Sequence, residues 1–519
     1  STLTTQRVCG EETTMGAGAK FLTNIALNEW HSMKIIYDGS SRTALFIVDE
    51  GKTSMASQTV DLNSQSSPYD FILNTLQFKS LYSDIFKVKN FRVFGTGTAS
   101  ASTPYELVSN NSVEYYPNPE GIEADPNYKV YVNSNPIFVH NTLKHSFTSF
   151  GTDTEISVSV EYINEPITSV DIRPKSLDVD YSISGNVVTF HMNKNNKVSV
   201  ELNGDTDNPL FIFANPLETN KPSATDANVH FFSAGKVYTQ ALTPKSGDII
   251  YIEGGAVVKG SITFQGKNDI KIAGYGLLDG RNTNQTVRMI KSSNISMDGL
   301  MVLNNLNWTV VSYETDSIDI ENIKVMSYES SMTDGIDILG SKHVKINNSF
   351  FYAEDDAICI KTTKFGYSKP VSDVNITNCI VSTHVGGNCL EIGYETELEV
   401  SDVHYSNIDI LRAGTNPDYT FRRAAIAIHN SGNGYIHNIS YDNIRIDEAL
   451  ENIFYISTLK TGFSQEPYLP GRIEDITFNN IRLNGGQHRP SIIQGYDAAN
   501  PLNNISFNKL VILHRVILR

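Results

Sequence analysis

A short phrase of alternating apolar and polar residues recurs along the second half of the chain, and in every copy but the last it ends in Asn or Gly. Strict alternation predicts a β-strand with one buried face. The final Asn or Gly tolerates the left-handed backbone of a tight turn. Nine copies follow one another in steps of 23 to 37 residues, and they begin at Ile270, Ile295, Ile318, Val344, Val374, Val403, Ile439, Ile476 and Ile505.

A repeat of this length with one strand in each copy is typical of a solenoid. The Leu-rich phrase and the helical returns of leucine-rich repeats are absent, so the pattern favours stacked strands. We therefore predict a right-handed parallel β-helix over residues 228–519. A second ladder of apolar stretches, such as Asn388–Ile392 and Ala424–Ile428, falls within the same coils and places polar side chains along one strip.

The chain before the repeat also carries strand patterns. Alternating stretches between residues 125 and 225, separated by turn signals such as Ser184-Gly185-Asn186, predict a β-sandwich over residues 121–227. Residues 1–120 are predicted to form a further sandwich-like domain. Within it, residues 1–115 resemble part of a laminin-G or concanavalin-like sandwich, although such sandwiches are longer. The predicted fold class is all-β, with a right-handed parallel β-helix as catalytic domain preceded by β-sandwich domains.

Composition narrows the partners of this 519-residue chain. A hydrophobic content of 40% excludes wholesale disorder, and no apolar run approaches the roughly 20 residues that span a bilayer. The formal net charge of −16 argues against nucleic acid, because no basic stripe is available to displace counterions. It also disfavours a polyanionic substrate. We expect a polysaccharide partner, without nucleic acid or a membrane span, and leave the oligomeric state open.

Cysteines and the start of the chain bear on the compartment. Cys359, Cys379 and Cys389 lie in adjacent predicted coils, where buried free thiols are favoured over a disulfide, although a bridge stays open. The cysteines have no zinc-like spacing, and we expect neither a metal nor a cofactor. The polar start Ser1–Thr5 carries no signal peptide, as in a processed secreted chain or a trimmed one. We expect a secreted or extracytoplasmic protein.

Three carboxylates lie one strand-step apart in neighbouring coils. Asp334 belongs to Thr333-Asp334-Gly335-Ile336-Asp337, and Asp355-Asp356 follows in the next coil, with 22 residues between Asp334 and Asp356. This offset suits one coil of a β-helix, in which strands stack about 4.8 Å apart. Like charges so close are costly to keep, whereas paired acids with separate roles are what glycoside hydrolysis needs. We predict that all three are catalytic, and that Asp337 is a structural or exposed ladder residue.

This pattern resembles that of glycoside hydrolase family 28, the polygalacturonases, and of the related family 49, the dextranases and isopullulanases. The resemblance extends from about residue 125 to 460. It implies that Asp355 is the general acid, that Asp334 and Asp356 activate the water, and that the reaction inverts the anomeric centre. Inversion asks for carboxyl groups about 6.5–9.5 Å apart.

Two motifs of family 28 are missing from this chain. The family carries Gly-His-Gly on the next coil, where this chain has Gly386-Gly387-Asn388 with His384 nearby but out of place. No Arg-x-Lys follows, and Arg422-Arg423 is the nearest basic pair. Because these groups would clamp a galacturonate carboxylate, their absence favours a neutral glucan such as dextran or pullulan. The order of sandwich and helix also agrees with family 49.

Polar and aromatic side chains along the same strip are candidate substrate contacts. Aromatic rings suit the apolar faces of sugars, and the others can hydrogen-bond to hydroxyl groups. These candidates are Trp308, Lys361, Asn388, Glu391, Tyr394, Arg423 and His429. Three alternatives stay open: a polygalacturonase-type pectin hydrolase, a polysaccharide lyase that uses Ca²⁺ with a basic residue such as Lys361 as base, and a non-catalytic carbohydrate-binding β-helix protein.

Overall fold

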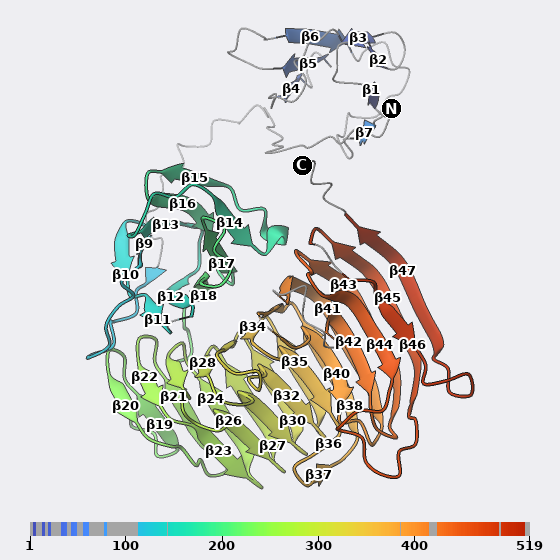
Figure 1. Cartoon of the computed structure of the whole chain (residues 1–519). Helices are drawn as coiled ribbons and strands as arrows, with labels where there is room; N and C mark the ends of the chain where they lie inside the picture. The colour runs from blue at the N-terminus through green and yellow to red at the C-terminus, as the bar shows by residue number, and fades with distance from the viewer. Residues whose placement is uncertain are drawn as a thin grey trace. The chain divides into compact units, whose positions relative to one another are not determined.

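A computed structural model describes residues 113–142, 144–384, 386–414, 423–486 and 489–513, together with seven short strands nearer the N-terminus (Figure 1). The chain divides into two compact units, Ser1–Val108 and Ser109–Arg519. Most of the predicted laminin-G-like segment lies outside the described residues, and the predicted domain limits at 120 and 227 stay predictions. The strands of the first unit are β1 (Thr4–Gln6), β2 (Thr13–Met15), β3 (Ala19–Phe21), β4 (Met33–Asp38), β5 (Thr43–Val48), β6 (Ala56–Asp61) and β7 (Gln77–Lys79).

Two sheets face each other at the start of the second unit and form a β-sandwich. One has the order β10 (Asn135–Ile137), β9 (Tyr128–Val132), β13 (Ile156–Tyr162), β16 (Val187–Met192) and β15 (Tyr181–Ser184). The other has the order β11 (His140–Asn141), β12 (Ser146–Thr152), β18 (Leu210–Asn215), β17 (Lys197–Leu202) and β14 (Val170–Arg173), with β8 (Val113–Glu114) paired to β12. A 3₁₀ turn, η1 (Lys175–Leu177), follows β14. All pairs are antiparallel except β12 with β18, which run parallel. The buried side chains of both sheets form one core.

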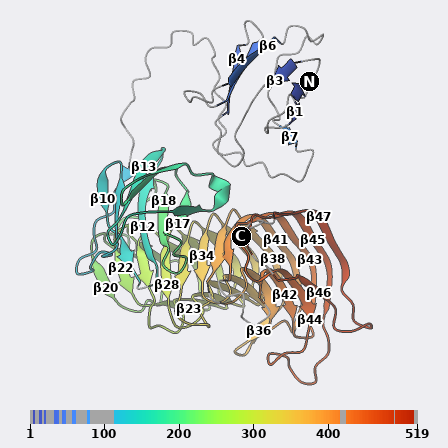
Figure 2. The same cartoon turned by 45° about the horizontal axis from the view of Figure 1, so that its top comes forward.

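The rest of the described chain is a parallel β-helix with three strips of strands (Figures 1 and 2). The first strip contains β19 (Val229–Phe232), β21 (Ile249–Ile252), β24 (Asn268–Ala273), β27 (Ser293–Asp298), β30 (Asp316–Glu321), β33 (Lys342–Asn347), β38 (Val371–Thr377), β41 (Val400–Ala413), β43 (Tyr435–Ile446), β45 (Arg472–Leu483) and β47 (Asn503–Ile512). The second contains β20 (Val237–Thr239), β22 (Val257–Lys259), β25 (Leu277–Asp279), β28 (Met301–Asn304), β31 (Lys324–Ser327), β34 (Phe350–Ala353) and β39 (Ile380–Thr383), after which the long β41 continues it. The predicted fold class is confirmed.

The third strip faces the other two across a core of stacked aliphatic side chains. It contains β23 (Ile262–Gln265), β26 (Val287–Ile290), β29 (Val310–Tyr313), β32 (Ile336–Leu339), β35 (Ile358–Lys361), β40 (Leu390–Tyr394), β42 (Ala424–Asn430), β44 (Asn452–Thr458) and β46 (Ile492–Gln494). A two-stranded hairpin, β36 (Thr363–Lys364) with β37 (Tyr367–Ser368), follows β35. In each coil, a loop therefore leads from the second strip to the third.

The recurring phrase forms the first strip, and its final residue turns the chain as predicted. All nine terminal positions have positive φ, from Gly274 to Lys509. Asn side chains at four of the turns also stack and hydrogen-bond along the helix, since Asn407 Nδ2 donates to Asn378 Oδ1 at 2.6 Å and Asn443 Nδ2 donates to Asn407 Oδ1 at 3.0 Å. The predicted preference for buried free thiols is confirmed for Cys359, Cys379 and Cys389.

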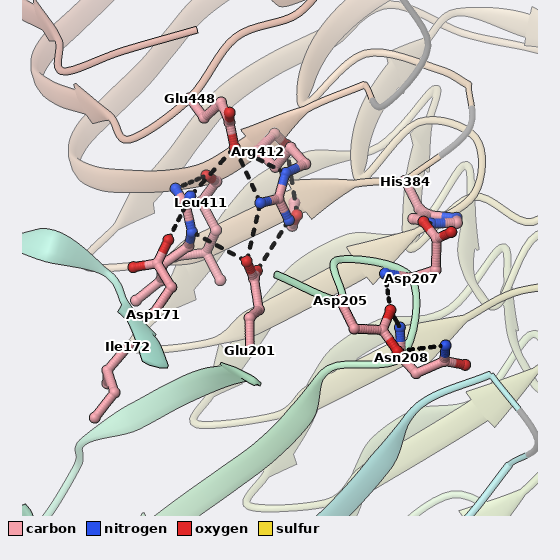
Figure 3. A network of polar contacts seen from close by, with 12 residues as sticks. Asp171, Ile172, Glu201, Asp205, Asp207, Asn208, His384, Leu411, Arg412 and Glu448 are labelled. Carbon is pink, nitrogen blue, oxygen red and sulfur yellow. Dashed lines mark hydrogen bonds and ion pairs between the residues drawn. The ribbon is translucent and has the colours of Figure 1, made fainter. Parts of the chain in front are cut away.

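The sandwich packs against the second strip of the β-helix. Aromatic side chains of β12 and β18, including Phe211 and Phe213, lie against Phe350 and Tyr352 of β34. At the edge of this contact Arg412 donates to both carboxylate oxygens of Glu201, at 2.9 and 3.0 Å (Figure 3). The sandwich thus borders the loops that lead from the second strip to the third. No helix in the described part of the chain is long and apolar enough to cross a membrane.

Candidate active site

The three predicted acids lie in two of these loops, just before their strands begin. Ile336 of β32 pairs with Ile358 of β35, so Asp334 and Asp356 take equivalent places on neighbouring coils. The two loops approach closely, because the Gly335 amide donates to the Asp356 carbonyl at 2.8 Å. A Cβ atom on Gly335 would stand 2.4 Å from the Ala357 carbonyl oxygen. The residue after Asp334 must therefore be glycine for the coils to stack.

The carboxyl groups converge as the sequence predicts. One oxygen each from Asp334, Asp355 and Asp356 lies within 4.8 Å of the other two. Asp334 and Asp356 are buried, whereas Asp355 keeps part of its surface open to solvent. These closest oxygens are nearer than the carboxyl separation of about 6.5–9.5 Å that is usual for inverting glycosidases. Such a group could hold a water molecule or a cation, since carboxylate oxygens are ligands for both.

Asp356 is held in place by the next coil. Its Oδ1 accepts hydrogen bonds from the Asn388 amide at 2.7 Å and from Asn388 Nδ2 at 3.0 Å. The Asn388 carbonyl oxygen of the side chain in turn accepts from the Ala424 amide at 2.8 Å, which fixes the orientation of that side chain. Two donors on one carboxylate oxygen hold the Asp356 side chain in one orientation. Asn388, a predicted substrate contact, is 2% exposed and so serves to orient Asp356.

The surroundings of Asp355 oppose its ionised form. Burial, reinforced by the neighbouring Asp356 carboxylate, raises the pKa of Asp355 well above its usual value, against the opposing effects of Lys361 and Arg423. A raised pKa keeps a carboxylic acid protonated at higher pH, as a general acid requires. The glycine pair of the next coil, Gly386-Gly387, lets Arg423 approach: a Cβ atom on Gly386 would stand 2.5 Å from an Arg423 guanidinium nitrogen. Arg423 is therefore packed on the loop that follows β39.

Lys361 lies beneath Asp334 and is almost completely buried. Its Nζ donates to Asp337 Oδ1 at 2.7 Å, to Asp334 Oδ2 at 3.3 Å and to Cys359 Sγ at 2.8 Å, and it stands 4.5 Å from the centre of the Trp308 ring. Burial alone would lower the pKa of Lys361, but Asp337, Cys359 and Asp334 outweigh it and raise that pKa well above its usual value. The ammonium group thus supplies a fixed positive charge to two buried aspartates.

Asp334 responds to the same surroundings. Burial, then the Asp337 carboxylate, raises the pKa of Asp334 well above its usual value, and Lys361 opposes this rise. Asp334 Oδ1 is buried without a hydrogen-bond partner. Asp337 is fully buried rather than exposed. Its contact with Lys361 could have been predicted from the alternation of strand side chains, because Asp337 pairs in register with Cys359 and Lys361 lies two residues further on the same face.

Known proteins with similar sequences include polygalacturonases and a dextranase. The family model described as glycosyl hydrolases family 28 matches residues 224–509, which is more than half of the chain. The chain belongs to this family. A polygalacturonase of Chamaecyparis obtusa is 24% identical over 40% of this chain and 39% of its own length. A dextranase of Arthrobacter globiformis is 24% identical over 38% of this chain and 35% of its own length. The matches thus span well under half of these two relatives.

One solved structure similar to the chain is Dex49A from Penicillium minioluteum, with a TM-score of 0.48 and 12% identity over 76% of this chain and 96% of that one.

Beyond the acids, a buried pair of side chains, Glu391 and His429, fills the next part of the strip in this family 28 chain. Both oxygens of Glu391 lie 3.0 Å from His429 Nδ1, and neither side chain is exposed. The Tyr394 ring stacks on the His429 ring with centres 4.4 Å apart, and the exposed Phe463 lies 5.6 Å from Tyr394. Glu391 and His429 were predicted substrate contacts, but this geometry gives them an internal role. Tyr394, partly exposed, can still face a ligand.

Trp308 is also largely buried. It is 5% exposed, lies over Lys361 and contacts the exposed Phe365 ring at 5.4 Å between centres. Its predicted stacking on sugar is therefore not supported by exposure, whereas Phe365, 61% exposed, was missed because an isolated aromatic residue in a hairpin carries no pattern.

His384 joins the loop that carries Asp355 to the sandwich (Figure 3). Its Nδ1 lies 3.1 Å from Glu354 Oε1, next to Asp355 in the chain, and its Nε2 lies 3.0 Å from Asp207 Oδ1. Burial lowers the pKa of His384, but the hydrogen bonds with Glu354 and Asp207 outweigh this and raise it. Sequence reasoning missed Asp207, because it precedes His384 by 177 residues and belongs to the sandwich rather than to the β-helix.

Proposed function

We propose that the protein is a secreted, inverting glycoside hydrolase that cleaves an α-glycosidic bond of a polysaccharide. The observation that carries this proposal is the meeting of Asp334, Asp355 and Asp356 within 4.8 Å, with different surroundings for each. Membership of glycosyl hydrolases family 28 supports the reaction class. Two acids whose pKa values are driven apart are the usual basis of such chemistry.

The surroundings assign a role to each acid. Asp355, whose pKa is raised by burial, donates its proton to the leaving glycosidic oxygen. Asp356, oriented by two hydrogen bonds from Asn388, accepts a proton from the attacking water. Asp334 helps to orient that water through its unpartnered Oδ1, while Lys361 balances its charge. The water oxygen then bonds to the anomeric carbon as the glycosidic bond breaks.

A neutral α-glucan is the substrate that we propose. At the part of the strip beyond the acids, Glu391 and His429 hydrogen-bond to each other in a buried pair, so the His429 ring is engaged inside the protein rather than by a sugar carboxylate. One relative is named a dextranase. The second candidate is polygalacturonate, because Arg423 lies near Asp355 and lowers its pKa, and other relatives are named polygalacturonases.

Two other readings have less support. A lyase would need a base that loses its proton, but Lys361 is buried among Asp334, Asp337 and Cys359, and its pKa is raised rather than lowered. A non-catalytic binding protein would have no use for three converging acids at a cost in stability.

The first test measures reducing sugar released from dextran, pullulan, an α-1,3-glucan and polygalacturonate. Asp355→Asn should lower kcat at least about a hundredfold on the substrate that is cleaved. Asp319→Asn, an exposed aspartate on β30, is the matched control and should retain full activity. Release that persists unchanged in Asp355→Asn would refute the assignment, and cleavage of polygalacturonate alone would refute the glucan.

The stereochemical outcome needs its own measurement, because the acid oxygens lie closer than inverting enzymes usually place them. Proton NMR of the freshly released reducing end should show the β-anomer first, since inversion converts an α-linkage. An initial α-anomer would show retention and would make one of the buried aspartates a nucleophile.

A further inference from the structure

A cavity of about 480 Å³ lies on the N-terminal side of the acids, along the same row of loops. Its volume falls within the roughly 300–1,000 Å³ of small-ligand sites. The residues that line it are Thr142, Thr239, Lys259, Gly260, Asp279, Arg281, Asn282, Thr283, Asn305, Tyr328 and Glu329.

Register places the cavity in line with the acid cluster. Thr239, Lys259 and Asp279 end three successive strands of the second strip and pair with one another in order. Tyr328 and Glu329, at the other margin, begin the loop after β31 that continues to Asp334. Since coils stack about 4.8 Å apart, the cavity extends over several coils, from the catalytic loop toward the N-terminus.

Apart from Gly260, every residue that lines the cavity has a side chain that can form hydrogen bonds, and the carbon atoms of these side chains make up much of the remaining lining. The charged groups balance, with two cations, Lys259 and Arg281, and two carboxylates, Asp279 and Glu329. An apolar ligand would offer no acceptor to the remaining donors of Lys259 and Arg281, and an anion would meet as many like charges as opposite ones. A sugar hydroxyl both donates and accepts, so it can pair with either kind of group.

The polar groups are held rigidly before any ligand binds. Arg281 makes a two-point contact with Asp279, from Nε to Oδ1 at 2.8 Å and from Nη2 to Oδ2 at 2.6 Å. Asn305 Nδ2 donates to Glu329 Oε2 at 3.0 Å, and Asn305 Oδ1 accepts from the Asn282 amide at 3.1 Å. Because a guanidinium has five N–H donors, Arg281 keeps donors for a ligand beyond those used on Asp279. Such preorganisation lowers the entropic cost of binding.

The sandwich contributes one wall. Thr142 is fixed by hydrogen bonds to the His145 carbonyl oxygen, from its Oγ1 at 2.8 Å and from its amide at 3.1 Å. The His145 ring packs edge-on against Tyr328, with centres 5.0 Å apart. The cavity is therefore built jointly by the sandwich and the β-helix.

We propose that this cavity is a distal saccharide subsite, which takes neutral pyranose units of the chain whose glycosidic bond is cut at the acid cluster. The proposal rests on the hydrolase function proposed above. It predicts that longer oligosaccharides are better substrates than short ones, and that the gain depends on the cavity and not on the acids.

Thr239→Trp is the test variant, because this exposed position at the end of β20 lets a large ring fill the cavity. Lys259→Ala is the second variant, since Lys259 is exposed and forms no ion pair in the described part of the chain. Lys345→Ala, exposed on β33 of the first strip, is the control. Kinetics are measured on a ladder of oligosaccharides of increasing length prepared from whichever polysaccharide is cleaved.

Thr239→Trp should lower kcat/KM about tenfold on the long members, the equivalent of a lost hydrogen bond or two, and leave the shortest cleaved member unchanged. Lys345→Ala should match wild type throughout. A length dependence in Thr239→Trp identical to that of wild type overturns the subsite while the hydrolase proposal stands.

A binding assay distinguishes the subsite proposal from the hydrolase proposal. In gels that contain dextran or pullulan, the Asp355→Asn chain should be retarded, and addition of Thr239→Trp should reduce this retardation. Retardation that depends on Thr239 in a protein that cleaves nothing would support the subsite and refute the hydrolase. Absence of retardation by either glucan, or retardation indifferent to Thr239→Trp, would refute the neutral subsite.

Discussion

At the scale of single residues, the site depends on one buried cation. Lys361 contacts Asp334 and Asp337 and lies over Trp308. It was predicted to bind substrate, but its position makes it the counter-ion of these two buried aspartates. Lys361 lowers the pKa of Asp334, Asp337 and Asp355, although burial of each carboxyl has the larger, opposite effect. The cation therefore decides at which pH the acid cluster can work.

Lys361→Met should move the alkaline limb of the pH profile of kcat/KM to higher pH, because the general acid Asp355 loses a charge that lowers its pKa. It should also destabilise the fold by about 3–5 kcal/mol, since two buried carboxylates lose their counter-ion. The profile is recorded where thermal unfolding shows the variant to be folded. Lys345→Met is the control, and a folded Lys361→Met protein with the wild-type profile would contradict the assignment.

Arg423→Gln should affect one limb alone. Arg423 lowers the pKa of Asp355, the proposed general acid, and so opposes the effect of burial there. The general acid must be protonated, so activity falls as pH rises through its pKa, and loss of Arg423 should move this alkaline limb to higher pH with the acidic limb fixed. The pH dependence of kcat/KM measures both limbs. A shift of the acidic limb would show that Arg423 acts on the base.

Asp355→Asn should stabilise the protein while it removes activity. A carboxyl whose pKa is raised in the folded state contributes stability below its unfolded pKa, and this contribution is lost as pH rises through the folded pKa. The gain from Asn, on the order of 1 kcal/mol for each tenfold difference in proton affinity between the folded and unfolded chain, should therefore appear near neutral pH and vanish in acid. Urea unfolding near neutral pH and in acid measures the difference in unfolding free energy between wild type and Asp355→Asn. An equal difference at the two pH values would contradict the raised pKa of Asp355.

At the scale of elements, the turn after each first-strip strand combines backbone and side chain. Asn407 has φ of 57° and hydrogen-bonds through its side chain to Asn378, Asn443 and Arg445. Glycine shares its tolerance of positive φ but lacks the amide. The same turn recurs along the helix, so substitutions at Asn407 show how much the backbone conformation and the side-chain hydrogen bonds each contribute at these turns.

Asn407→Ala should cost about 2 kcal/mol, because it loses the ladder of hydrogen bonds and strains the left-handed backbone. Asn407→Gly should cost less, since it keeps the backbone conformation and loses the ladder alone. Urea unfolding of both proteins gives the two free energies. Equal costs would show that the side-chain ladder accounts for the whole effect.

At the scale of the whole molecule, the second unit is held together by an aromatic contact and a buried ionic network. Arg412 and Arg173 both contact Glu201 and Glu448, and Arg173 also donates to the Leu411 carbonyl oxygen at 3.1 Å (Figure 3). This network brings the sandwich beside the catalytic loops, where Asp207 reaches His384. The sandwich is thus part of the site's surroundings and not a separate appendage.

Arg412→Leu should destabilise the protein by about 3–5 kcal/mol, because it leaves the Glu201 carboxylate buried without its two-point partner. Addition of Glu201→Leu should recover part of this loss, since the unpaired charge is then gone. Unfolding of both single variants and the double variant forms a cycle. Strict additivity would show that the pair contributes no coupling energy.

The sequence alone determined the strands, the stacking of the coils and the convergence of the acids. Alternation has a period of two, so it specifies which face is buried, and the offset of 22 residues between Asp334 and Asp356 fixes their register once a coil is one repeat long. Positive φ at Asn and Gly is equally local, because it depends on the residue's own sterics. These features were predictable without any long-range contact.

The tertiary structure decided what each side chain in the strip meets. Whether Lys361, Glu391 or His429 faces a ligand depends on loop bends and on neighbours in other coils, and all three are buried against partners. The link from Asp207 to His384 and the cavity walled by Thr142 join segments far apart in sequence. Alternation carries no information on such contacts, because burial of charge depends on the sum of all nearby groups rather than on local pattern.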